Sequence, residues 1–265
     1  MPEGDTVFLT AHRLNDALAG NTLTRGEIRH PSLSTVDLAG REVAGVGSVG
    51  KHIFTRLADG VSLHSHLRMD GSWHLYRPGE HWRRPTHQIR AILSTSDRSA
   101  VGFLLHDLEL LPTAEESRLV GHLGPDLLHP SWDAAMAAEA ARRLAADPSR
   151  QLGLALLDQR VMAGVGNLYK AEVCFLLRVS PWSPVSAIDP AKAVELSHKL
   201  LLRNAWRPEQ STTGELARGR QHWVYERGGK RCLRCGHAIV RAMQGSGLQQ
   251  RPTWYCPHCQ PGPTA

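Results

Sequence analysis

The chain has no long hydrophobic run. None of its 265 residues lies in an apolar stretch approaching the roughly 20 residues that a membrane-spanning helix needs. Its first residues also lack the basic region and the hydrophobic stretch of a secretory signal. These absences exclude a membrane partner and predict an intracellular, cytoplasmic protein.

Cysteine is scarce, with five residues in the whole chain. In a reducing compartment few cysteines favour thiolate metal ligands over disulfides. Four of them form two C-x-x-C pairs, Cys232 with Cys235 and Cys256 with Cys259, which is the spacing of a tetrahedral zinc site. Because sulfur takes all four positions, such a zinc ion is structural and not catalytic. Cys174 stands alone in an apolar stretch, which predicts core packing.

Internal repeats and long low-complexity segments are absent too. The length therefore predicts two lobes and a small appendage. Lys and Arg total 31 against 25 acidic residues, a net charge of +6. This excess favours a polyanionic partner, although a basic protein that is merely soluble would have the same composition.

The first part of the chain, residues 1–125, alternates short apolar runs with Gly, Asp-Gly and Pro breaks, which is typical of a β-sandwich or barrel. The clearest runs are Val43–Val49, Lys51–Leu57, Val61–His66 and Gln88–Leu93. Thr6–Ala19 instead has helical spacing, and a helix there would hold the first residues in one place.

After Pro130 the periodicity becomes helical. The expected helices are Asp133–Ala146, Gln151–Gln159, Asn167–Arg178 and Ala191–Ala205, and Leu248–Tyr255 is an expected strand before the second cysteine pair. The predicted fold class is a multidomain α+β protein. Its domains are a β-sandwich (1–125), a helical domain (130–222) and a four-cysteine zinc-finger hairpin (223–261).

Chemistry is expected at the beginning of the chain and at one glycine-rich turn. Once Met1 is removed, Pro2 becomes a secondary amine, a nucleophile, with the carboxylic acid of Glu3 beside it. Further along, Gly164-Val165-Gly166-Asn167 joins two amphipathic helices. Asn167 stands where an N-cap would lie, with amides beside it that predict an anion site. An ordinary capped helical hairpin is the alternative for this turn.

Six separated motifs occur in one order: Pro2-Glu3-Gly4, Gly50-Lys51, Ser65-His66, Gly124-Pro125-Asp126, Gln159–Glu172 and Arg251–Pro257. With them the chain resembles the Fpg/Nei family of DNA glycosylases over nearly its whole length. The resemblance implies a β-sandwich, a helix-two-turn-helix domain and a zinc finger. It also implies one structural Zn²⁺ and a monomer at the nucleoid, with damaged DNA as partner, duplex or single-stranded.

The same resemblance implies catalytic roles. Pro2 would attack C1′ of the damaged nucleotide, and Glu3 would act as general acid on the sugar ring oxygen. The role of Glu3 requires a proton at neutral pH, and burial or the neighbouring Asp5 would raise its pKa. Lys51 would assist elimination unless it is a surface charge. Arg251 would grip the phosphates next to the lesion and support δ-elimination.

Four residues are implied to contact DNA. Asn167 would bind phosphate, and Arg68 and Met69 would fill the gap left by the flipped nucleotide, with core packing as the alternative for Met69. His122 stands where endonuclease VIII relatives place an arginine, and a lone histidine is more often structural. Fpg-type enzymes carry an Arg-Phe pair where this chain has Asp107–Leu111, a departure that favours the endonuclease VIII branch.

The sequence thus predicts a bifunctional DNA glycosylase and abasic-site lyase, which removes mainly oxidised pyrimidines through a Schiff base and β,δ-elimination. Two alternatives keep the fold: a non-catalytic zinc-finger protein that binds damaged DNA, and an Fpg-like enzyme for oxidised purines. A third is a metal-dependent hydrolase or oxygenase, because His64 and His66 alternate on one strand face.

Overall fold

The computed structural model describes residues 2–247 and 250–264. Two compact units divide this part of the chain. The first contains Pro2 and Thr6–His122, and the second contains Glu3–Asp5 and the residues from Leu123 onward. Within the described ranges, no helix combines the length and the apolar character needed to cross a bilayer.

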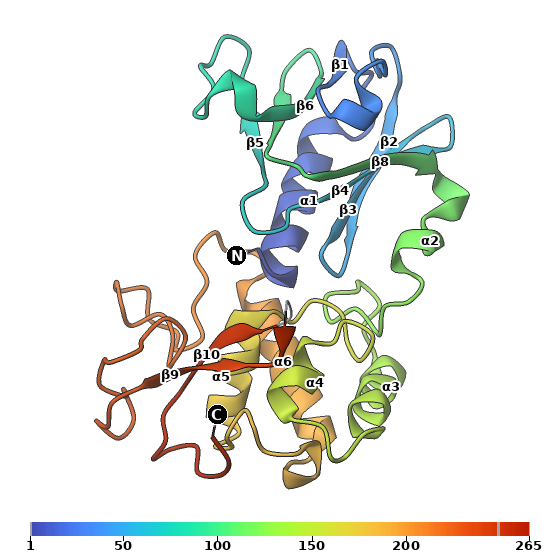
Figure 1. The fold of residues 1–265 in the computed structure, drawn as a ribbon. Coiled ribbons are helices and arrows are strands. Elements are labelled where there is room, and N and C mark those ends of the chain that lie inside the picture. The colour runs from blue at the N-terminus through green and yellow to red at the C-terminus, as the bar shows by residue number, and fades with distance from the viewer. Residues whose placement is uncertain (1, 248–249, 265) are drawn as a thin grey trace. The chain divides into compact units, whose positions relative to one another are not determined.

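The first unit contains two antiparallel sheets of four strands each (Figure 1). One sheet has the order β1-β6-β7-β5, made of Arg25–Ile28, Ile89–Ser94, Ser99–Phe103 and Ser72–Tyr76. The other has the order β2-β3-β4-β8, made of Val43–Val49, His52–Leu57, Val61–His66 and Asp107–Pro112. Short helical turns connect them: η1 (Pro31–Leu33), η2 (Thr86–Gln88), η3 (Thr113–Glu115) and α2 (Ser117–Val120).

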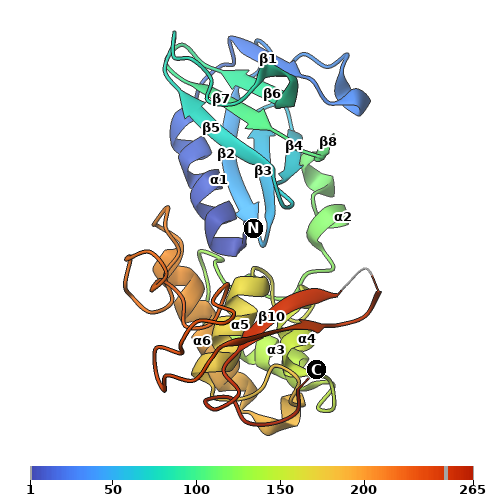
Figure 2. The same ribbon diagram turned by 60° about the vertical axis from the view of Figure 1, so that its left-hand side comes forward.

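Helix α1 (Gly4–Leu18) runs along the strands of this unit (Figure 2). Its apolar face enters the core, where Val7 and Leu14 are 1% exposed and Leu18 is fully buried. The Asn15 side chain accepts a hydrogen bond of 2.8 Å from the amide of Val46, which fixes the helix against β2. Burial of these side chains, at about 1.5–3 kcal/mol for each large one, holds the amino-terminal helix in place.

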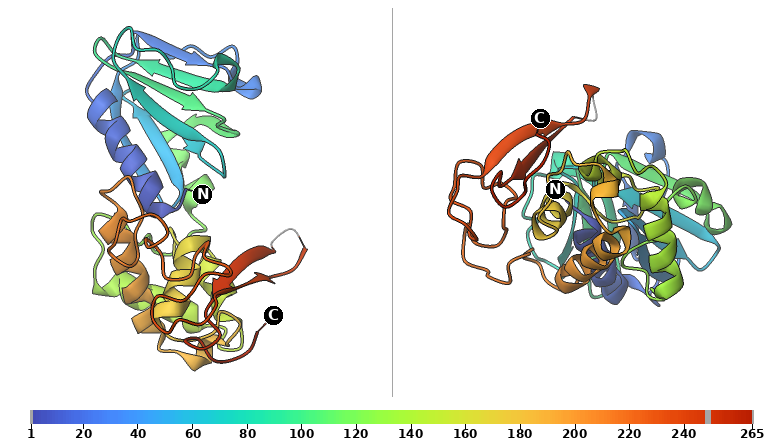
Figure 3. Two further views of the ribbon diagram at one scale, coloured as in Figure 1. Left: turned by 90° about the vertical axis from the view of Figure 1, so that its left-hand side faces the viewer. Right: turned by 90° about the horizontal axis from the view of Figure 1, so that it is seen from below.

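The second unit is helical, with α3 (Ala134–Ala145), α4 (Leu152–Leu157), α5 (Asn167–Leu176), η4 (Val185–Ala187) and α6 (Pro190–Asn204). Helix α5 is central, because every one of its residues from Asn167 to Phe175 is buried. The hairpin of β9 (Val240–Gln244) and β10 (Arg251–Tyr255) lies beside α5 (Figure 3). Phe175, Trp254, Cys232 and Cys256 belong to one hydrophobic cluster, so the finger shares a core with α5.

The predicted fold class is confirmed, and most element boundaries differ by only one to three residues. Lys51 lies in the two-residue turn between β2 and β3 and not in β3, because Val49 pairs with His52. Leu248 and Gln249, the first residues of a predicted strand, lie outside the described residues, and β10 begins at Arg251. The division between residues 130–222 and 223–261 stays a prediction.

Candidate active site and metal centre

The carboxylate of Glu3 sits at the amino-terminal end of α5. The Glu3 side chain is 1% exposed. Its Oε2 atom accepts hydrogen bonds from the amides of Gly166 at 2.8 Å and Tyr169 at 3.3 Å, and Oε1 accepts one from Leu168 at 2.6 Å. All four residues belong to the second unit, since Glu3–Asp5 are part of it. Glu3 therefore satisfies the amides that a helix normally leaves without partners.

This arrangement corrects two sequence-based expectations. Gly166 is the N-cap of α5 and Asn167 is the first helical residue, because Glu3 performs the capping that a side chain at the N-cap usually performs. The amides predicted to bind an external anion bind the chain's own carboxylate instead. Three backbone N–H groups therefore donate to the Glu3 carboxylate at the amino-terminal end of α5.

Glycines allow the first residues to approach this turn. The amide of Gly4 donates to the carbonyl of Gly164 at 2.9 Å. Gly164 has a φ of +111°, a conformation that other residues rarely adopt. A Cβ atom on Gly166 would lie 2.4 Å from Cδ of Glu3. Gly166 is thus required for the position of the Glu3 carboxylate.

Asp5 is also buried at this position, with 1% of its surface exposed. Its carboxylate accepts hydrogen bonds from the Tyr169 hydroxyl at 2.7 Å and from Nε2 of Gln210 at 2.9 Å. Burial, and after it the charge of Asp5, raises the pKa of Tyr169 well above its ordinary value, so the phenol stays a donor. Asp5 therefore connects the amino terminus to α5 and to the segment after α6.

Two side chains on one face of α5 bind successive residues of β10. Nδ2 of Asn167 donates to the carbonyl of Pro252 at 2.8 Å, while Oδ1 of Asn167 is buried without a hydrogen-bond partner among the described residues. Nζ of Lys170 donates to the Thr253 hydroxyl at 2.5 Å. Arg251, the predicted phosphate-gripping residue, is exposed and directly precedes this pair.

A second buried carboxylate, Glu172, anchors the chain that leads into the finger. It is fully buried and accepts hydrogen bonds from the amides of Trp223 at 2.8 Å and of Val224 and Tyr225 at 2.9 Å. Lys170 and Glu172 are buried polar residues of α5 that were not predicted as functional from the sequence. The sequence contains a signal for both, because a lysine and a glutamate inside the apolar run Asn167–Leu176 require buried hydrogen-bond partners.

In the first unit, Lys51 is half-buried and follows Gly50, whose φ is +58°. Three histidines from β3 and β4 lie beside this turn. Nδ1 of His52 is 2.9 Å from Nε2 of His64, and the ring of His52 is 5.0 Å from that of His66. The three rings line one face of the sheet next to Lys51.

Burial, and after it the charges of the other histidines, lowers the pKa of His52 to about 3. Burial likewise lowers the pKa of His66 to about 4, although the charge of Asp107 opposes this. The three are therefore neutral at physiological pH. Within residues 2–247 and 250–264, neither His64 nor His66 belongs to a group of three ligand atoms close enough for a metal ion, which argues against a histidine metal site.

The predicted wedge residues lie at the tip of the loop after β4. Met69 is 69% exposed, so the alternative that it packs in the core is wrong. Arg68 has a φ of +52°, and its Nη2 donates to Asp107 at 3.0 Å. This ion pair is exposed and contributes little stability, about 0–1 kcal/mol. His122 is exposed at the end of the first unit.

The four cysteines of the two pairs come together. Sγ of Cys232 lies 3.9 Å from that of Cys259, and Sγ of Cys235 lies 3.5 Å from that of Cys256. All four sulfur atoms are within 4.8 Å of one another. Zn–S bonds of about 2.3 Å in a tetrahedron place sulfurs about 3.8 Å apart, so these residues can hold one metal ion. Cys174 is fully buried, and burial raises the pKa of its thiol to about 12.

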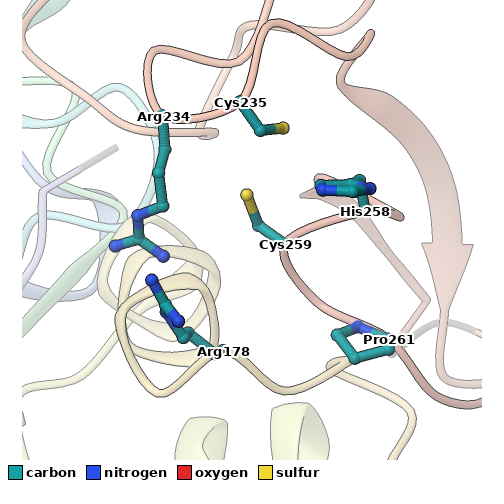
Figure 4. Close-up of a pocket in the computed structure, with 6 residues that line it drawn as sticks. All are labelled: Arg178, Arg234, Cys235, His258, Cys259 and Pro261. Carbon is teal, nitrogen blue, oxygen red and sulfur yellow. The ribbon is translucent and has the colours of Figure 1, made fainter.

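A cavity of about 370 Å³ borders this metal centre, and Figure 4 shows Cys235, Cys259 and His258 around it, with the guanidinium groups of Arg178 and Arg234 close to each other. The Arg234 guanidinium lies 4.3 Å from the centre of the Phe175 ring. Its Nη1 donates to the carbonyl of Phe175 at 3.5 Å. Arg234 thus attaches the first cysteine pair to the carboxyl-terminal end of α5.

The structure brings Glu3, Asn167 and the β10 strand that carries Arg251 together in the second unit. Lys51, Arg68 and Met69 belong to the first unit, as does Pro2, which precedes Glu3 in the chain. Pro2 and the Glu3 carboxylate are therefore kept next to each other by covalent connectivity.

Comparisons with known proteins cover nearly the entire chain. Residues 1–106 match the formamidopyrimidine-DNA glycosylase N-terminal domain, and residues 123–215 match the formamidopyrimidine-DNA glycosylase H2TH domain. A probable endonuclease 8 2 of Streptomyces coelicolor is 54% identical, covering 99% of this chain and 95% of that protein. The DNA-(apurinic or apyrimidinic site) lyase Nei2 of Mycolicibacterium smegmatis is 46% identical, covering 98% and 99%.

Solved structures share the fold. Lactococcus lactis Fpg in complex with DNA containing an abasic site superposes with a TM-score of 0.79 at 21% identity, covering 98% of this chain and all of that one. MutM in complex with DNA containing carbocyclic 8-oxo-G gives a TM-score of 0.79 at 23% identity with the same coverage. These likenesses confirm the fold. The matched domains and the full-length relatives show that the chain belongs to the formamidopyrimidine-DNA glycosylase family, with relatives named endonuclease 8.

Proposed function

We propose that this chain is a bifunctional DNA glycosylase and abasic-site lyase of base excision repair, with Pro2 as nucleophile. The observation that carries the proposal is the Glu3 carboxylate, buried at the amino-terminal end of α5 by three amide hydrogen bonds. A carboxylate held this firmly next to a potential amino-terminal amine is a preorganised proton acceptor and donor. Relatives named endonuclease 8 and DNA-(apurinic or apyrimidinic site) lyase support the same activity.

The chemistry follows from these two residues. Removal of Met1, which lies outside the described residues, frees the Pro2 nitrogen. That nitrogen forms a bond to C1′ of the nucleotide while the bond from C1′ to the base breaks, and the departing base takes a proton from water. The nitrogen then passes its proton to the Glu3 carboxylate, which the amides hold ready to receive it. Glu3 donates this proton to the ring oxygen as the sugar opens, leaving an iminium ion on Pro2.

The iminium ion makes the C2′ proton acidic, and its loss expels the 3′ phosphate in β-elimination. Lys51 is proposed to assist this step, and Arg251 to grip phosphate and support the following δ-elimination. Asn167 is proposed to bind the DNA backbone with its second amide hydrogen, since the first is donated to Pro252.

The exposed loop with Arg68 and Met69 is proposed to fill the space of the flipped nucleotide, which suits a methionine that is 69% exposed. His122, exposed at the end of the first unit, is proposed to contact the DNA backbone. The four cysteines are proposed to bind one structural Zn²⁺ and so to stabilise a finger domain, residues 223–261. The other two proposed domains are a sandwich, residues 1–125, and a helical domain, residues 130–222.

Damaged DNA is the proposed partner, and oxidised pyrimidines are the proposed main substrates. The full-length relatives named endonuclease 8 support the endonuclease VIII branch of the family. The residues Asp107–Leu111, which replace an Arg-Phe pair, support it as well.

The test is covalent trapping. Borohydride added to processed enzyme and DNA with thymine glycol or an abasic site should reduce the iminium ion and leave a stable protein–DNA adduct. Pro2→Gly should lower trapping, and Glu3→Gln should lower base removal by about a hundredfold or more, as expected for loss of a proton-transfer group.

Three outcomes would decide against the proposal. Equal trapping by Pro2→Gly would assign the chemistry to another amine. Binding of damaged DNA with no trapping by the native protein would favour a non-catalytic binder. Faster release of oxidised purines than of oxidised pyrimidines from a lesion panel would assign the chain the Fpg specificity.

A further inference from the structure

Lys170 is a buried charge that the proposed chemistry does not use. Its side chain is fully buried in the second unit. Within residues 2–247 and 250–264, this side chain makes one hydrogen bond, to the Thr253 hydroxyl at 2.5 Å, and no ion pair with a carboxylate. A buried ammonium without a carboxylate is costly, so its presence requires a compensating role.

Lys170 begins a line of buried polar groups that crosses the finger hairpin. The Thr253 hydroxyl in turn contacts Oε1 of Gln244 at 3.5 Å, from β10 to β9. Nε2 of Gln244 donates to the carbonyl of Pro181 at 2.8 Å and to Oε1 of Gln151 at 3.0 Å. This line links α5, both hairpin strands and the segments before α4 and after α5.

The line holds the strand beside Arg251 in one register. Asn167 and Lys170 are three residues apart on α5 and so share a face. They bind Pro252 and Thr253, the two residues that follow Arg251. With both residues attached to α5, the backbone of Arg251 is fixed relative to the same helix that holds Glu3.

We propose that Lys170 is a positioning residue, which sets the place of Arg251 on the DNA backbone by fastening β10 to α5. The proposal rests on the proposed function, since Arg251 acts only if the chain cleaves DNA. Burial lowers the pKa of Lys170 to about 8, a shift that the charge of Glu3 opposes and the charge of Arg251 increases. The Lys170 side chain is therefore still mostly charged at neutral pH, and burial of this charge lowers the free energy of unfolding.

The experiment separates Pro2 chemistry from Arg251 chemistry on one duplex with an abasic site. Lys170→Met keeps the length and removes the charge and the donor, and Thr253→Val removes the acceptor while leaving the lysine. Lys192→Met is the matched control, because it makes the same substitution at an exposed position of α6. Borohydride trapping measures formation of the iminium ion on Pro2. The share of DNA cleaved on both sides of the lesion measures δ-elimination.

Lys170→Met and Thr253→Val should trap DNA as the wild type does, and two-sided cleavage should fall by about a hundredfold, the usual effect of a misplaced group. The slope of log affinity against log salt should decrease by about one in Lys170→Met, as in Arg251→Ala, although buried Lys170 cannot touch phosphate.

The double variant Arg251→Ala with Lys170→Met should lose no more two-sided cleavage than Arg251→Ala alone, because both changes act through Arg251. Lys170→Met should unfold at no lower temperature at neutral pH, because methionine removes a buried charge.

The inference would be overturned if Lys170→Met and Thr253→Val both cleaved the DNA on two sides as often as the wild type does. It would also be overturned if borohydride trapping fell by the same factor as two-sided cleavage. Failure of the wild type itself to trap DNA would instead overturn the proposed function, and the inference with it.

Discussion

At the residue scale, one carboxylate serves both the fold and the proposed chemistry. Glu3 caps α5 with hydrogen bonds to residues 163 to 166 positions away in the chain. Hydrogen bonds to a charged group contribute about 1.5–3 kcal/mol each. The hydrogen bonds that stabilise the amino-terminal segment therefore also orient the Glu3 carboxylate next to Pro2.

A single added methyl group should displace the Glu3 carboxylate and so test its proposed catalytic role. In Gly166→Ala the new Cβ would lie 2.4 Å from Cδ of Glu3, so the carboxylate must move. We expect base removal to fall by about a hundredfold, because displacement of a catalytic group by about 1 Å has that effect. Single-turnover release of thymine glycol measures it.

Gly45→Ala is the control for this change. Its Cβ would meet only Oδ1 of Asn15 at 3.5 Å, an ordinary contact, on a strand of the first unit. Unchanged single-turnover rates in both variants would show that the position of Glu3 is not critical.

At the scale of elements, the β3–β4 pair couples stability to pH through His52. The folded protein binds a proton on His52 only near pH 3, whereas an unfolded histidine binds one near 6.5. Between these values the unfolded chain holds more protons, so the stability is fully present above about pH 6.5 and is lost as the pH falls toward 3. At pH 4 the loss from His52 amounts to about 3 kcal/mol.

Thermal unfolding from pH 7 to pH 4 measures this effect. The unfolding temperature of the wild type should fall over that range, and His52→Gln should show a smaller fall, since the glutamine does not titrate. His81→Gln, at an exposed loop position, should follow the wild type. Identical pH profiles for the wild type and His52→Gln would contradict the prediction.

The finger hairpin should depend on the proposed zinc ion. Cys232 and Cys256 pack in one cluster with Phe175 of α5, so loss of the metal also disturbs the core around that helix. Structural zinc sites contribute about 10–16 kcal/mol of apparent folding free energy. Chelation or Cys232→Ser should therefore unfold the hairpin and weaken binding to abasic-site DNA, measured by fluorescence anisotropy.

Cys174 provides the matched cysteine control. It is fully buried in α5, and its raised pKa keeps the thiol protonated. Elemental analysis should find one zinc ion per chain in Cys174→Ala and none in Cys232→Ser. Zinc retained at full stoichiometry in Cys232→Ser would exclude the four-sulfur site.

At the scale of the whole molecule, the charge of +6 predicts affinity dominated by phosphate contacts. A protein that makes six to ten such contacts loses about 10³–10⁵ in affinity between 50 and 200 mM salt. We expect a loss in this range for abasic-site duplexes, with the same slope for two unrelated flanking sequences. A DNA affinity that does not change with salt concentration, or that differs between the two flanking sequences, would contradict this expectation.

Local patterns predicted the five longer helices and the strands β2, β3, β4, β6 and β10, whereas no range was predicted for β1, β5, β7, β8 and β9. Strand Val43–Val49 was predicted with its observed ends, and the apolar spacing of Thr6–Ala19 located α1 within two residues. Gly164 and Gly166 marked the turn before α5. The N-cap was misplaced because the capping group comes from Glu3, which no local rule connects to Gly166. Lys170 was missed because burial depends on packing by β10.

The sequence by itself determined the alternation of strands and helices, the two cysteine pairs able to hold a metal ion and the motifs that identify the family, because each depends on spacing within a short segment. Only the tertiary structure decided that Glu3 occupies the amides before α5, that Met69 is exposed, and that Lys170 fastens β10 to α5. These contacts join residues far apart in the chain, and their formation depends on which surfaces pack and exclude water, a property that no single segment contains.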